Sequence, residues 1–319
     1  MVIVVGSLNM DLVVRAPKIP RPGETVLGTD FSQIPGGKGA NQADASVKLG
    51  AKTKMLGAVG KDTMGNLLKL SLQNDGVDVN GVLEKEDYPT GIAAIVVENS
   101  GNNAITVAPG ANSHFTPDDL SQMESVFENA HVLLVQLETP IETVLTALKL
   151  AKKHNLITIL NPAPAALLNE EIFALVDILT PNETELELLS GLPTATLNEV
   201  KKAGQSLIKK GVSELIVTLG NQGSMHITKD FSKIYTAYRV HAVDTTAAGD
   251  SFNGALAVCT SNGLTIEESI LFATKVGAMT VTKPGAQTSL PLLHEVENFE
   301  AWYEENRFYG FDLGRESLK

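Results

Sequence analysis

Cysteine is almost absent from this sequence. Among the 319 residues only Cys259 carries a thiol, which excludes an internal disulfide and a cysteine-based metal centre. Cys259 falls on the apolar side of a predicted helix, so we expect a buried structural thiol rather than a nucleophile.

Basic residues are scarce relative to acidic ones. The chain has 25 lysines and arginines against 37 aspartates and glutamates, and its formal net charge is −12. Non-specific nucleic-acid binding needs a basic surface that neutralises phosphates, so we exclude a general nucleic-acid partner. A small anionic ligand stays compatible with this charge, because backbone N–H groups or a metal ion can reverse the sign of the local field.

Long apolar runs and a secretory leader are absent as well. The sequence begins Met1-Val2-Ile3-Val4-Val5-Gly6, without a basic lead or a small-residue cleavage site. No apolar stretch approaches the ~20 residues that a membrane-spanning helix requires. We therefore expect a cytoplasmic protein without membrane contacts.

Two nucleotide-binding motifs are missing. The dinucleotide fingerprint needs three spaced glycines after the first strand, and only Gly6 is present there. The glycine-rich segment Gly36-Gly37-Lys38-Gly39 has no Ser or Thr after its lysine and the wrong spacing for a phosphate loop of the Walker type. If the protein binds a nucleotide, it does so by other means.

The chain does contain a regular alternation of strand and helix patterns. Start signals of the capping-box type at Thr139–Glu142, Thr196–Glu199 and Thr265–Glu268 predict three helices. Between helices lie short apolar runs, typical of strands buried on both faces of a parallel sheet. From this alternation we predict an α/β fold with a doubly wound, mostly parallel sheet flanked by helices. The expected strands are 2–5, 54–58, 132–136, 158–161, 177–180 and 214–219.

Two β-rich insertions interrupt this alternation, at about 12–34 and 90–109. The first contains the strand-like runs Leu12–Val14 and Thr25–Leu27, separated by several prolines. The second reads as a hairpin of Gly91–Val97 and Asn103–Ala108. We expect the insertions to form a small separate sheet, either a lid over a site or a surface for oligomer contacts.

The stretch from Asp244 to Ala255 predicts a turn that leads directly into a helix. Its small residues Ala247, Ala248 and Gly249 would present three consecutive free N–H groups to an anion. Asp250 follows, where a general base could take a proton from an attacking hydroxyl, a role worth about 10² to 10⁴ in rate. Alternatively, Asp250 favours the helix dipole and Asp244 caps a turn.

Polar residues also stand at predicted strand ends, where open α/β sheets bind ligands. Asn9 and Asp11 follow the first strand, and Glu138 closes another, in positions to accept bonds from hydroxyl groups. Lys38 and Asn41 would donate to a ligand that the neighbouring glycines allow to approach closely. Each also has a simpler interpretation, as a turn, a lead into a helix or a solvated lysine.

Three later segments suit a phosphorylated ligand. Asn182 and Glu185 share one side of a starting helix and offer oxygens for Mg²⁺ held through waters, or merely an acidic first turn. Thr218–Gly223 is a strand followed by a glycine turn, compatible with a nucleotide edge or a plain hairpin. The irregular loop 280–289 is rich in carbonyls and hydroxyls that can bind a cation or wrap a base. Beyond residue 306 the sequence shows no period.

Taken together, the segments 9–11, 36–41, 182–185 and 244–250 resemble the ribokinase and phosphofructokinase-B family of sugar kinases, in the same order and over nearly the whole chain. The resemblance implies one kinase domain, 1–319, with the insertions as a lid. It implies ATP-dependent phosphorylation of D-ribose at its primary 5-hydroxyl, giving ribose 5-phosphate and ADP. The alternatives are another sugar or nucleoside kinase, acting on deoxyribose, fructose or adenosine, and a non-catalytic sugar or nucleotide sensor.

The resemblance also implies roles for individual residues. Asp250 would be the catalytic base, and the N–H groups of Ala247, Ala248 and Gly249 the anion hole. Glu185 would contact Mg²⁺ through water. The implied sugar contacts are Asn9, Met10, Asp11, Gly37, Lys38, Gly39, Ala40, Asn41, Glu138 and Asp250. The implied ATP contacts are Asn182, Thr218, Leu219, Gly220, Asn221, Gln222, Gly223, Gly249, Asp250 and Thr274.

A potassium site and a dimer are implied in the same way. The matching potassium positions are Asp244, Thr246, Thr280, Lys283, Gly285 and Ser289. Two departures from the family pattern are Pro284, where relatives often have a basic residue, and Thr274, where His or Asn is common beside the adenine. The lid is the usual dimer contact in such kinases, so we expect a homodimer.

Overall fold

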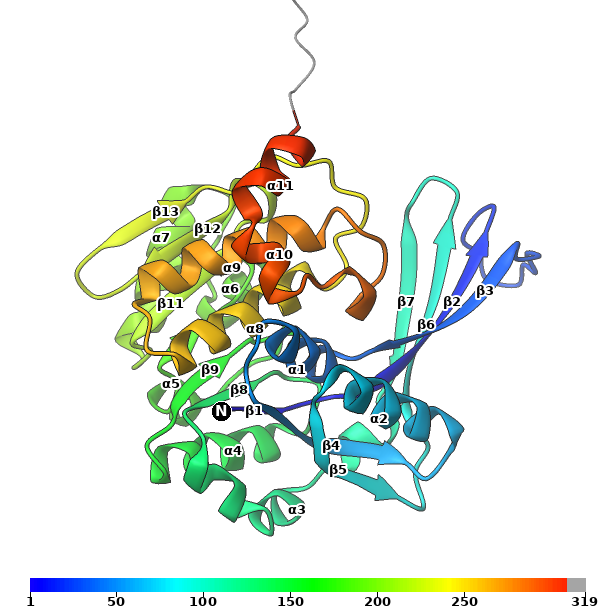
Figure 1. Cartoon of the computed structure of the whole chain (residues 1–319), viewed down its shortest axis with the longest axis horizontal. Coiled ribbons are helices and arrows are strands. Elements are labelled where there is room, and N and C mark those ends of the chain that lie inside the picture. The colour runs from blue at the N-terminus through cyan, green and yellow to red at the C-terminus, as the bar shows by residue number, and fades with distance from the viewer. Residues whose placement is uncertain (309–319) are drawn as a thin grey trace, which may run out of the picture.

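The computed structural model describes residues 1–308, so most of the aperiodic C-terminal stretch lies outside the described residues. Nine strands form one sheet in the order β13-β12-β11-β10-β9-β8-β1-β4-β5 (Figure 1). The strands from β11 through to β5 run parallel, and only β12 and β13 add antiparallel pairs at one edge. The predicted doubly wound, mostly parallel sheet is confirmed. The strands are β1 (Val2–Val5), β4 (Thr53–Gly60), β5 (Asp78–Lys85), β8 (Val132–Val135), β9 (Ile157–Leu160), β10 (Ile178–Leu179), β11 (Glu214–Thr218), β12 (Ser224–Ile227) and β13 (Ser232–Tyr235).

Helices cover both faces of this sheet, and the alternation of strand side chains produces two cores. In β1, Val2 and Val4 pack into one core, whereas Ile3 and Val5 pack into the other. The first core is covered by α1 (Lys38–Lys48), α2 (Thr63–Asp75), α8 (Ala248–Ser261), α9 (Ile266–Thr280), α10 (Leu293–Glu297) and α11 (Phe299–Asn306). The second is covered by α3 (Pro117–Ser121), α4 (Ile141–Lys153), α5 (Glu170–Ala174), α6 (Glu183–Ser190) and α7 (Leu197–Lys209).

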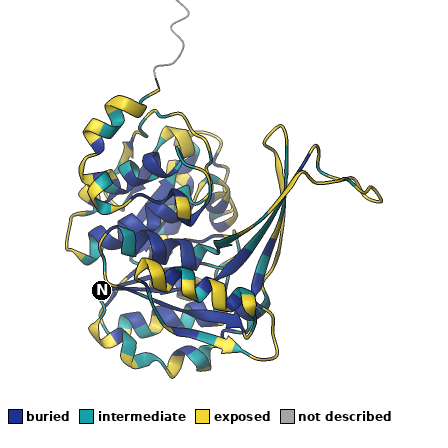
Figure 2. Ribbon diagram, turned by 45° about the vertical axis from the view of Figure 1, so that its right-hand side comes forward, coloured by how far each residue is buried: buried dark blue, intermediate teal, exposed yellow. Residues whose placement is uncertain are grey.

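The two β-rich insertions form a separate four-stranded sheet, in the order β3-β2-β6-β7. It consists of β2 (Asn9–Ala16), β3 (Asp30–Gly36), β6 (Gly91–Glu98) and β7 (Asn103–Ala108) and projects away from the body as the expected lid (Figure 1). Figure 2 shows that its outer parts are largely exposed while the body strands are buried.

One predicted lid strand is wrong. Thr25–Leu27 lies in a loop, and Leu27 is 85% exposed. The strand that pairs with β2 is Asp30–Gly36, which contains Pro35. Proline cannot donate to a ladder, but β3 is an edge strand of the lid, where proline is tolerated. Because β2 starts at Asn9 and β3 ends at Gly36, the lid is continuous with the segments expected to carry the site.

Of the three predicted helix caps, two are confirmed and one is wrong. Thr196 and Thr265 each form the predicted capping box. Thr139 does not: α4 has Pro140 as its N-cap, and the buried Thr139 hydroxyl has no partner in the described part of the chain. The extended backbone of Pro140, with ψ 139°, moves the helix start one residue beyond the expected cap. No helix among residues 1–308 is long and apolar enough to cross a membrane.

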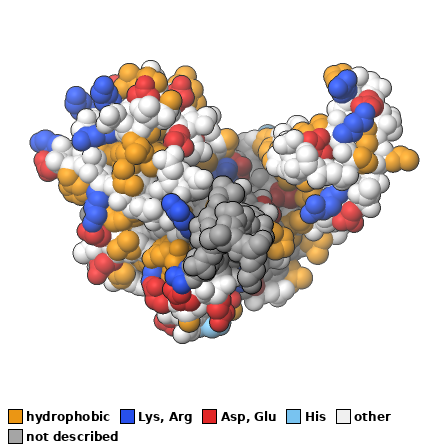
Figure 3. All heavy atoms as spheres, turned by 90° about the horizontal axis from the view of Figure 1, so that it is seen from above, with side chains coloured by type: hydrophobic (Ala, Val, Ile, Leu, Met, Phe, Trp, Pro, Cys, Tyr) orange, Lys and Arg blue, Asp and Glu red, His pale blue; other side chains and the backbone are white. Residues whose placement is uncertain are grey.

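The topology fixes where a ligand would bind. The chain leaves β1 toward β4 and β5 on one side and continues through β8 to β11 on the other, so the winding reverses beside β1. Ligands of open α/β sheets bind outside the carboxyl ends of strands at such a reversal. The base of the lid lies at the same place, and an open hollow separates lid from body when the molecule is seen from above (Figure 3).

Candidate active site

Asp250 lies in the first turn of α8 and is 7% exposed. Both of its carboxylate oxygens accept hydrogen bonds from amides of α1. Asn41 Nδ2 donates to Oδ2 at 2.9 Å, and Gln42 Nε2 donates to Oδ1 at 3.0 Å. The carboxylate is therefore held in one orientation at the positive end of a helix.

The backbone before Asp250 differs from the expected row of three free donors. The Ala248 N–H donates to the Thr245 carbonyl at 3.2 Å, so it is not free. Ala247 adopts a left-handed conformation, φ 60°, which closes this turn and is rare for a residue with a side chain. Such strain costs about 1–2 kcal/mol and clusters at functional sites. Within the described residues, the N–H groups of Ala247 and Gly249 have no hydrogen-bond partner.

Asp11 lies within electrostatic reach of two other carboxylates, Glu138 and Asp250. Glu138 accepts a short bond from the Ser7 hydroxyl and one of 3.1 Å from the Lys38 backbone N–H. Asp11 projects from β2, and burial, reinforced by the negative charges of Glu138 and Asp250, raises the pKa of its carboxyl to about 7. The site thus holds more negative charge than the protein alone compensates.

Lys38 supplies the nearby positive charge. Burial by itself would lower the pKa of its ammonium group, but the carboxylates of Asp250, Glu138 and Glu185 outweigh burial and raise that pKa. Lys38 therefore stays charged and lies within electrostatic reach of all three carboxylates. A cation that reaches both Asp250 and Glu185 is suited to a ligand that extends between them.

The glycines beside Lys38 allow the chain to approach itself. A Cβ on Gly37, which has φ 92°, would lie 2.7 Å from the Asn9 backbone nitrogen, and one on Gly39 would lie 2.6 Å from that of Ser7. Both distances are too short for any side chain. The glycines thus bring the start of α1 against the β1–β2 connection, which places Lys38 and Asn41 beside Asp250.

Asn9 is held by the turn through which the lid rejoins the body. Asn112, in the 3₁₀ turn Gly110–His114 that follows β7, donates to Asn9 Oδ1 at 2.8 Å. Its amide also bonds to the N–H and the carbonyl of Leu8, each at 3.0 Å. Asn112 is 1% exposed, so this clamp is internal to the fold.

The residues expected at the nucleotide come together beyond Asp250. Asn182 caps α6 and pairs with Thr218 in a parallel bridge at the end of β11. Glu185 completes a capping box, since its two oxygens accept the Asn182 N–H at 2.9 Å and Nδ2 at 3.0 Å. Burial raises the pKa of Glu185 despite these bonds. Farther away along the chain, Thr274 in α9 donates to its own helix, at the Ile270 carbonyl.

Three of the expected potassium positions, Asp244, Thr246 and Gly285, are joined by hydrogen bonds. Asp244 Oδ1 accepts the Thr246 N–H at 2.9 Å and hydroxyl at 2.6 Å, and Oδ2 accepts the Gly285 N–H at 2.9 Å. Burial alone would raise the pKa of Asp244, but these bonds lower it overall. Lys283 instead directs its side chain to Glu295 at 3.2 Å. The 244–246 turn and the 280–289 loop therefore form one oxygen-rich unit.

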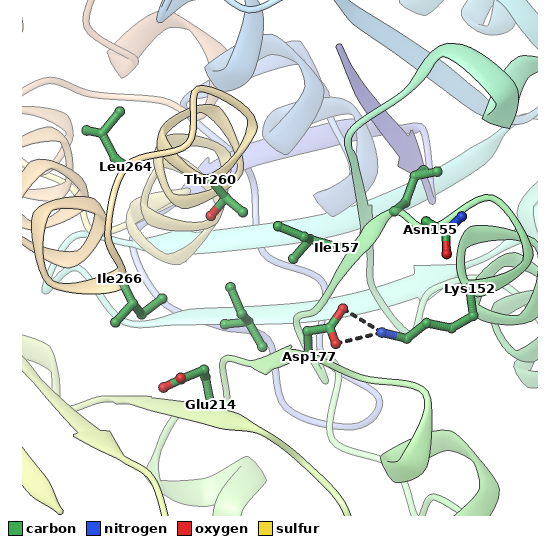
Figure 4. Close-up of a pocket in the computed structure, with 10 residues that line it drawn as sticks. Lys152, Asn155, Ile157, Asp177, Glu214, Thr260, Leu264 and Ile266 are labelled. Atoms are coloured by element: carbon green, nitrogen blue, oxygen red, sulfur yellow. Dashed lines mark hydrogen bonds and ion pairs between the residues drawn. The ribbon is translucent and has the colours of Figure 1, made fainter.

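A separate pocket lies at the opposite ends of the strands (Figure 4). It is lined by residues at the amino ends of β9 to β11, including Ile157 and Glu214, and Lys152 Nζ bonds both oxygens of Asp177 there at 2.6 Å. None of the predicted site residues lines it. The polar site at the carboxyl ends is the better candidate for chemistry.

Comparison with known proteins agrees with this location. The family model of pfkB carbohydrate kinases matches residues 1–293. The chain belongs to the pfkB family of carbohydrate kinases. It is 40% identical to a ribokinase of Haemophilus influenzae over 93% of this chain and 97% of that protein, and 35% identical to a deoxyribokinase of Salmonella typhi over the same shares. The structure of an Arabidopsis thaliana ribokinase, complexed with ribose and ATP, matches with a TM-score of 0.87 and 32% identity over 93% of this chain and 97% of that one.

The carbohydrate kinase brings most of the predicted polar residues to one place, but two predicted sugar contacts have buried side chains. Met10 is 2% exposed and Ala40 is 1% exposed, and both pack into a hydrophobic core. The alternation of side chains along β2 turns Met10 away from the side that carries Asn9 and Asp11. Neither side chain is available to a ligand.

The sequence patterns did not predict several residues that support the site. Gln42 directly follows Asn41 and bonds to Asp250, and Ser7 and Asn112 support Glu138 and Asn9. A signal did exist for Gln42: α1 has a run of polar residues at positions that an amphipathic helix would leave apolar. Nothing local distinguishes Asn112, because its partners lie more than 100 residues away.

Proposed function

We propose that this kinase transfers the terminal phosphoryl group of ATP to the primary 5-hydroxyl of D-ribose, giving ribose 5-phosphate and ADP. The observation that carries the proposal is the buried Asp250 carboxylate, held by two amides beside the free Gly249 N–H. A base and an anion-binding donor side by side are what in-line phosphoryl transfer needs. Ribokinases of 37–40% identity among the relatives support ribose as the acceptor.

In this proposal Asp250 accepts the proton of the attacking hydroxyl as the oxygen bonds to phosphorus. The N–H groups of Gly249 and Ala247 stabilise the charge on the transferring group. Lys38 adds a positive charge near Asp250, Glu138 and Glu185. The Asp11 and Glu138 carboxylates accept hydrogen bonds from the remaining sugar hydroxyls, and the Asn9 amide donates one, which suits a small polyol.

The ATP side is proposed from the segments that meet beyond Asp250. Asn182 and the turn from Thr218 to Gly223 would contact the nucleotide, with Thr274 near the base. Burial raises the pKa of Glu185, and the negative charge of Asp250 adds to this effect, so a nearby Mg²⁺ would stabilise the Glu185 carboxylate. We assign it to the waters of Mg²⁺, which neutralises phosphate charge when bound.

For potassium, the donor set fits a hard cation because the unit around Asp244 offers carboxylate, hydroxyl and carbonyl oxygens. Asp244 and Thr246 would hold it with Thr280, Gly285 and Ser289, and Lys283 would contribute only its backbone carbonyl. We further propose that the enzyme works in the cytoplasm as a homodimer joined through the lid.

A deoxyribose kinase is the second candidate, because a deoxyribokinase is 35% identical over 93% of this chain. The deciding experiment measures ADP release with Mg²⁺-ATP and D-ribose, deoxyribose, fructose or adenosine, with and without potassium. We expect turnover with ribose to exceed the others and potassium to raise it. A preference for deoxyribose would reassign the substrate, and ATP binding without turnover on any acceptor would favour a sensor.

Asp250→Asn tests the chemistry itself. The amide has nearly the same shape but cannot accept the proton, so we expect kcat to fall by about 10² to 10⁴ while both substrates still bind. Isothermal titration would check binding and a coupled ADP assay the rate. Turnover close to that of the unmodified enzyme would remove Asp250 from its role as base.

A further inference from the structure

Gln42 occupies the centre of a buried hydrogen-bond network beneath Asp250. Its side chain is 0% exposed. Nε2 donates to Asp250 Oδ1 at 3.0 Å and to Asn161 Oδ1 at 3.1 Å, and Oε1 accepts from Gln136 Nε2 at 2.5 Å. A primary amide has two N–H groups, and both are used here.

These partners determine which way the Gln42 amide points. If its oxygen and nitrogen were exchanged, the oxygen would face the Asp250 carboxylate and the Asn161 carbonyl, two groups without a proton to give. At the same time Gln136 Nε2 would meet another donor. The network therefore admits one orientation, in which a donor points at Asp250.

The same network returns to the backbone just before the base. Asn161 Nδ2 donates to the Thr180 carbonyl at 3.1 Å, and the Thr180 hydroxyl donates to Asn253 Oδ1 at 2.6 Å. Asn253 Nδ2 then donates to the Gly249 carbonyl at 2.8 Å. Asp250 and its preceding residue are thus both tied to the carboxyl ends of β9 and β10.

We propose that Gln42 is a positioning residue that fixes the direction of the Asp250 carboxylate for proton transfer. The inference rests on the proposed kinase function, in which Asp250 is the base. Asn41 also bonds the carboxylate, but it is itself an expected sugar contact, so its amide is shared with the ligand. Gln42 has no exposed surface, and its influence on the reaction runs through Asp250.

The direct test is Gln42→Met, which keeps the length of the side chain and removes both donors. A reacting group misplaced by about 1 Å loses on the order of 10² in rate, so we expect kcat to fall by about 10- to 100-fold. The KM values for sugar and ATP should stay within about twofold, because Gln42 touches neither. Gln73→Met, an exposed glutamine of α2 replaced in the same way, is the matched control and should leave kcat unchanged.

Gln42→Glu adds a readout that a merely structural role would not move. Its ionised carboxylate repels Asp250, whereas its protonated form again offers a donor. The activity of this variant relative to the unmodified enzyme should therefore rise as the pH is lowered from 8 to 6, while that of Gln42→Met stays constant. A ratio for Gln42→Glu that does not change with pH contradicts the proposal.

A second route avoids the risk that Gln42→Met fails to fold. Gln136→Leu removes the bond that Gln42 accepts. Gln136 Oε1 is buried without a partner in the described structure, so no other side-chain bond is lost. We expect kcat to fall, by less than in Gln42→Met, again without a change in KM.

The outcomes of these experiments distinguish a failure of the positioning role from a failure of the proposed kinase function. An unmodified enzyme that phosphorylates no acceptor overturns both. An active enzyme whose folded Gln42→Met variant keeps full kcat, or loses activity through KM alone, overturns the positioning role only. If Gln42→Met does not fold, unchanged kcat in Gln136→Leu has the same consequence.

Discussion

At the scale of single residues, the site is defined by carboxylates that the fold holds close together. Holding carboxylates close together disfavours their ionised forms. Asp11 shows this most clearly, since burial and the charges of Glu138 and Asp250 raise its pKa to about 7. Asp44, buried in α1 and paired with Lys48 at 2.9 Å, also has its pKa raised by burial, to about 7. A ligand with hydroxyl donors would relieve Asp11, which suits a sugar.

These raised pKa values have a definite sign for stability. Between about pH 4 and pH 7 the folded protein binds protons on Asp11 and Asp44 that the unfolded chain has lost, so the free energy of unfolding falls as the pH rises through this range. Above pH 7 their contribution is constant. We expect Asp11→Asn to raise the melting temperature of the ligand-free protein by about 2–4 °C at pH 8 and to change it little at pH 4.5.

Thermal unfolding at both pH values checks this, with the exposed Asp87→Asn as the control for removing one negative charge. An equal rise in the melting temperature of Asp11→Asn at pH 4.5 and pH 8 would show that the ionised Asp11 carboxylate does not cause the destabilisation. Gains in both variants would point to the net charge of −12 instead.

Sequence patterns point to polar residues of this cluster where the signal lies within a few neighbouring residues. They miss residues whose partners are distant in the sequence. Asp250 follows small residues at a helix start, a pattern contained in one short segment of the sequence. Gln42 has only the polar run of α1 as a local signal, because its bonding partners Gln136, Asn161 and Asp250 come from three distant segments that only the folded sheet brings together. The sequence predicts three free N–H groups before Asp250, but the Ala248 N–H donates to the Thr245 carbonyl within the turn. The sequence pattern does not reveal this bond.

At the scale of elements, the central feature is the junction between lid and body. Strand β2 leaves the site at Asn9, β3 returns to it at Gly36, and β7 leads through Pro109 into the turn that carries Asn112. Asn112 bonds Leu8 and Asn9 across this junction. The helix starts at Thr196 and Thr265 were predictable because capping is local. The edge strand with Pro35 was not, because tolerance of proline depends on its position in the sheet.

Asn112→Ala should therefore impair sugar binding without removing the chemistry. It frees the Asn9 amide and leaves the buried Leu8 N–H without its partner, so we expect the KM for the sugar to rise about tenfold, equivalent to one lost hydrogen bond of ~1.4 kcal/mol, and the KM for ATP to change little. Steady-state kinetics with each substrate varied would measure this. Asn102→Ala at the exposed hairpin tip is the control, and equal effects in the two variants would exclude a specific clamp.

At the scale of the whole molecule, the lid carries exposed apolar side chains on one face. Strand register places Asp11, Ala93 and Val107 in one row across the lid, and Val13, Ile95 and Ile105 in the next row on the same face. Ile105 is 55% exposed and Val107 46%. The face that begins with a polar residue at the site thus continues outward as an apolar one, and such exposed patches mark interaction surfaces.

A second copy of the chain is the partner that this face fits in the expected homodimer, because two such sheets can pack face to face and bury their apolar rows. We expect sedimentation to give a dimer and Ile105→Lys to shift it toward monomer. Leu70→Lys, at a 53% exposed position of α2 outside the lid sheet, should leave the dimer intact. Since the apolar rows share a face with Asp11, loss of the dimer should also raise the KM for the sugar. A monomeric unmodified protein would mean that the apolar rows serve closure of the lid within one chain.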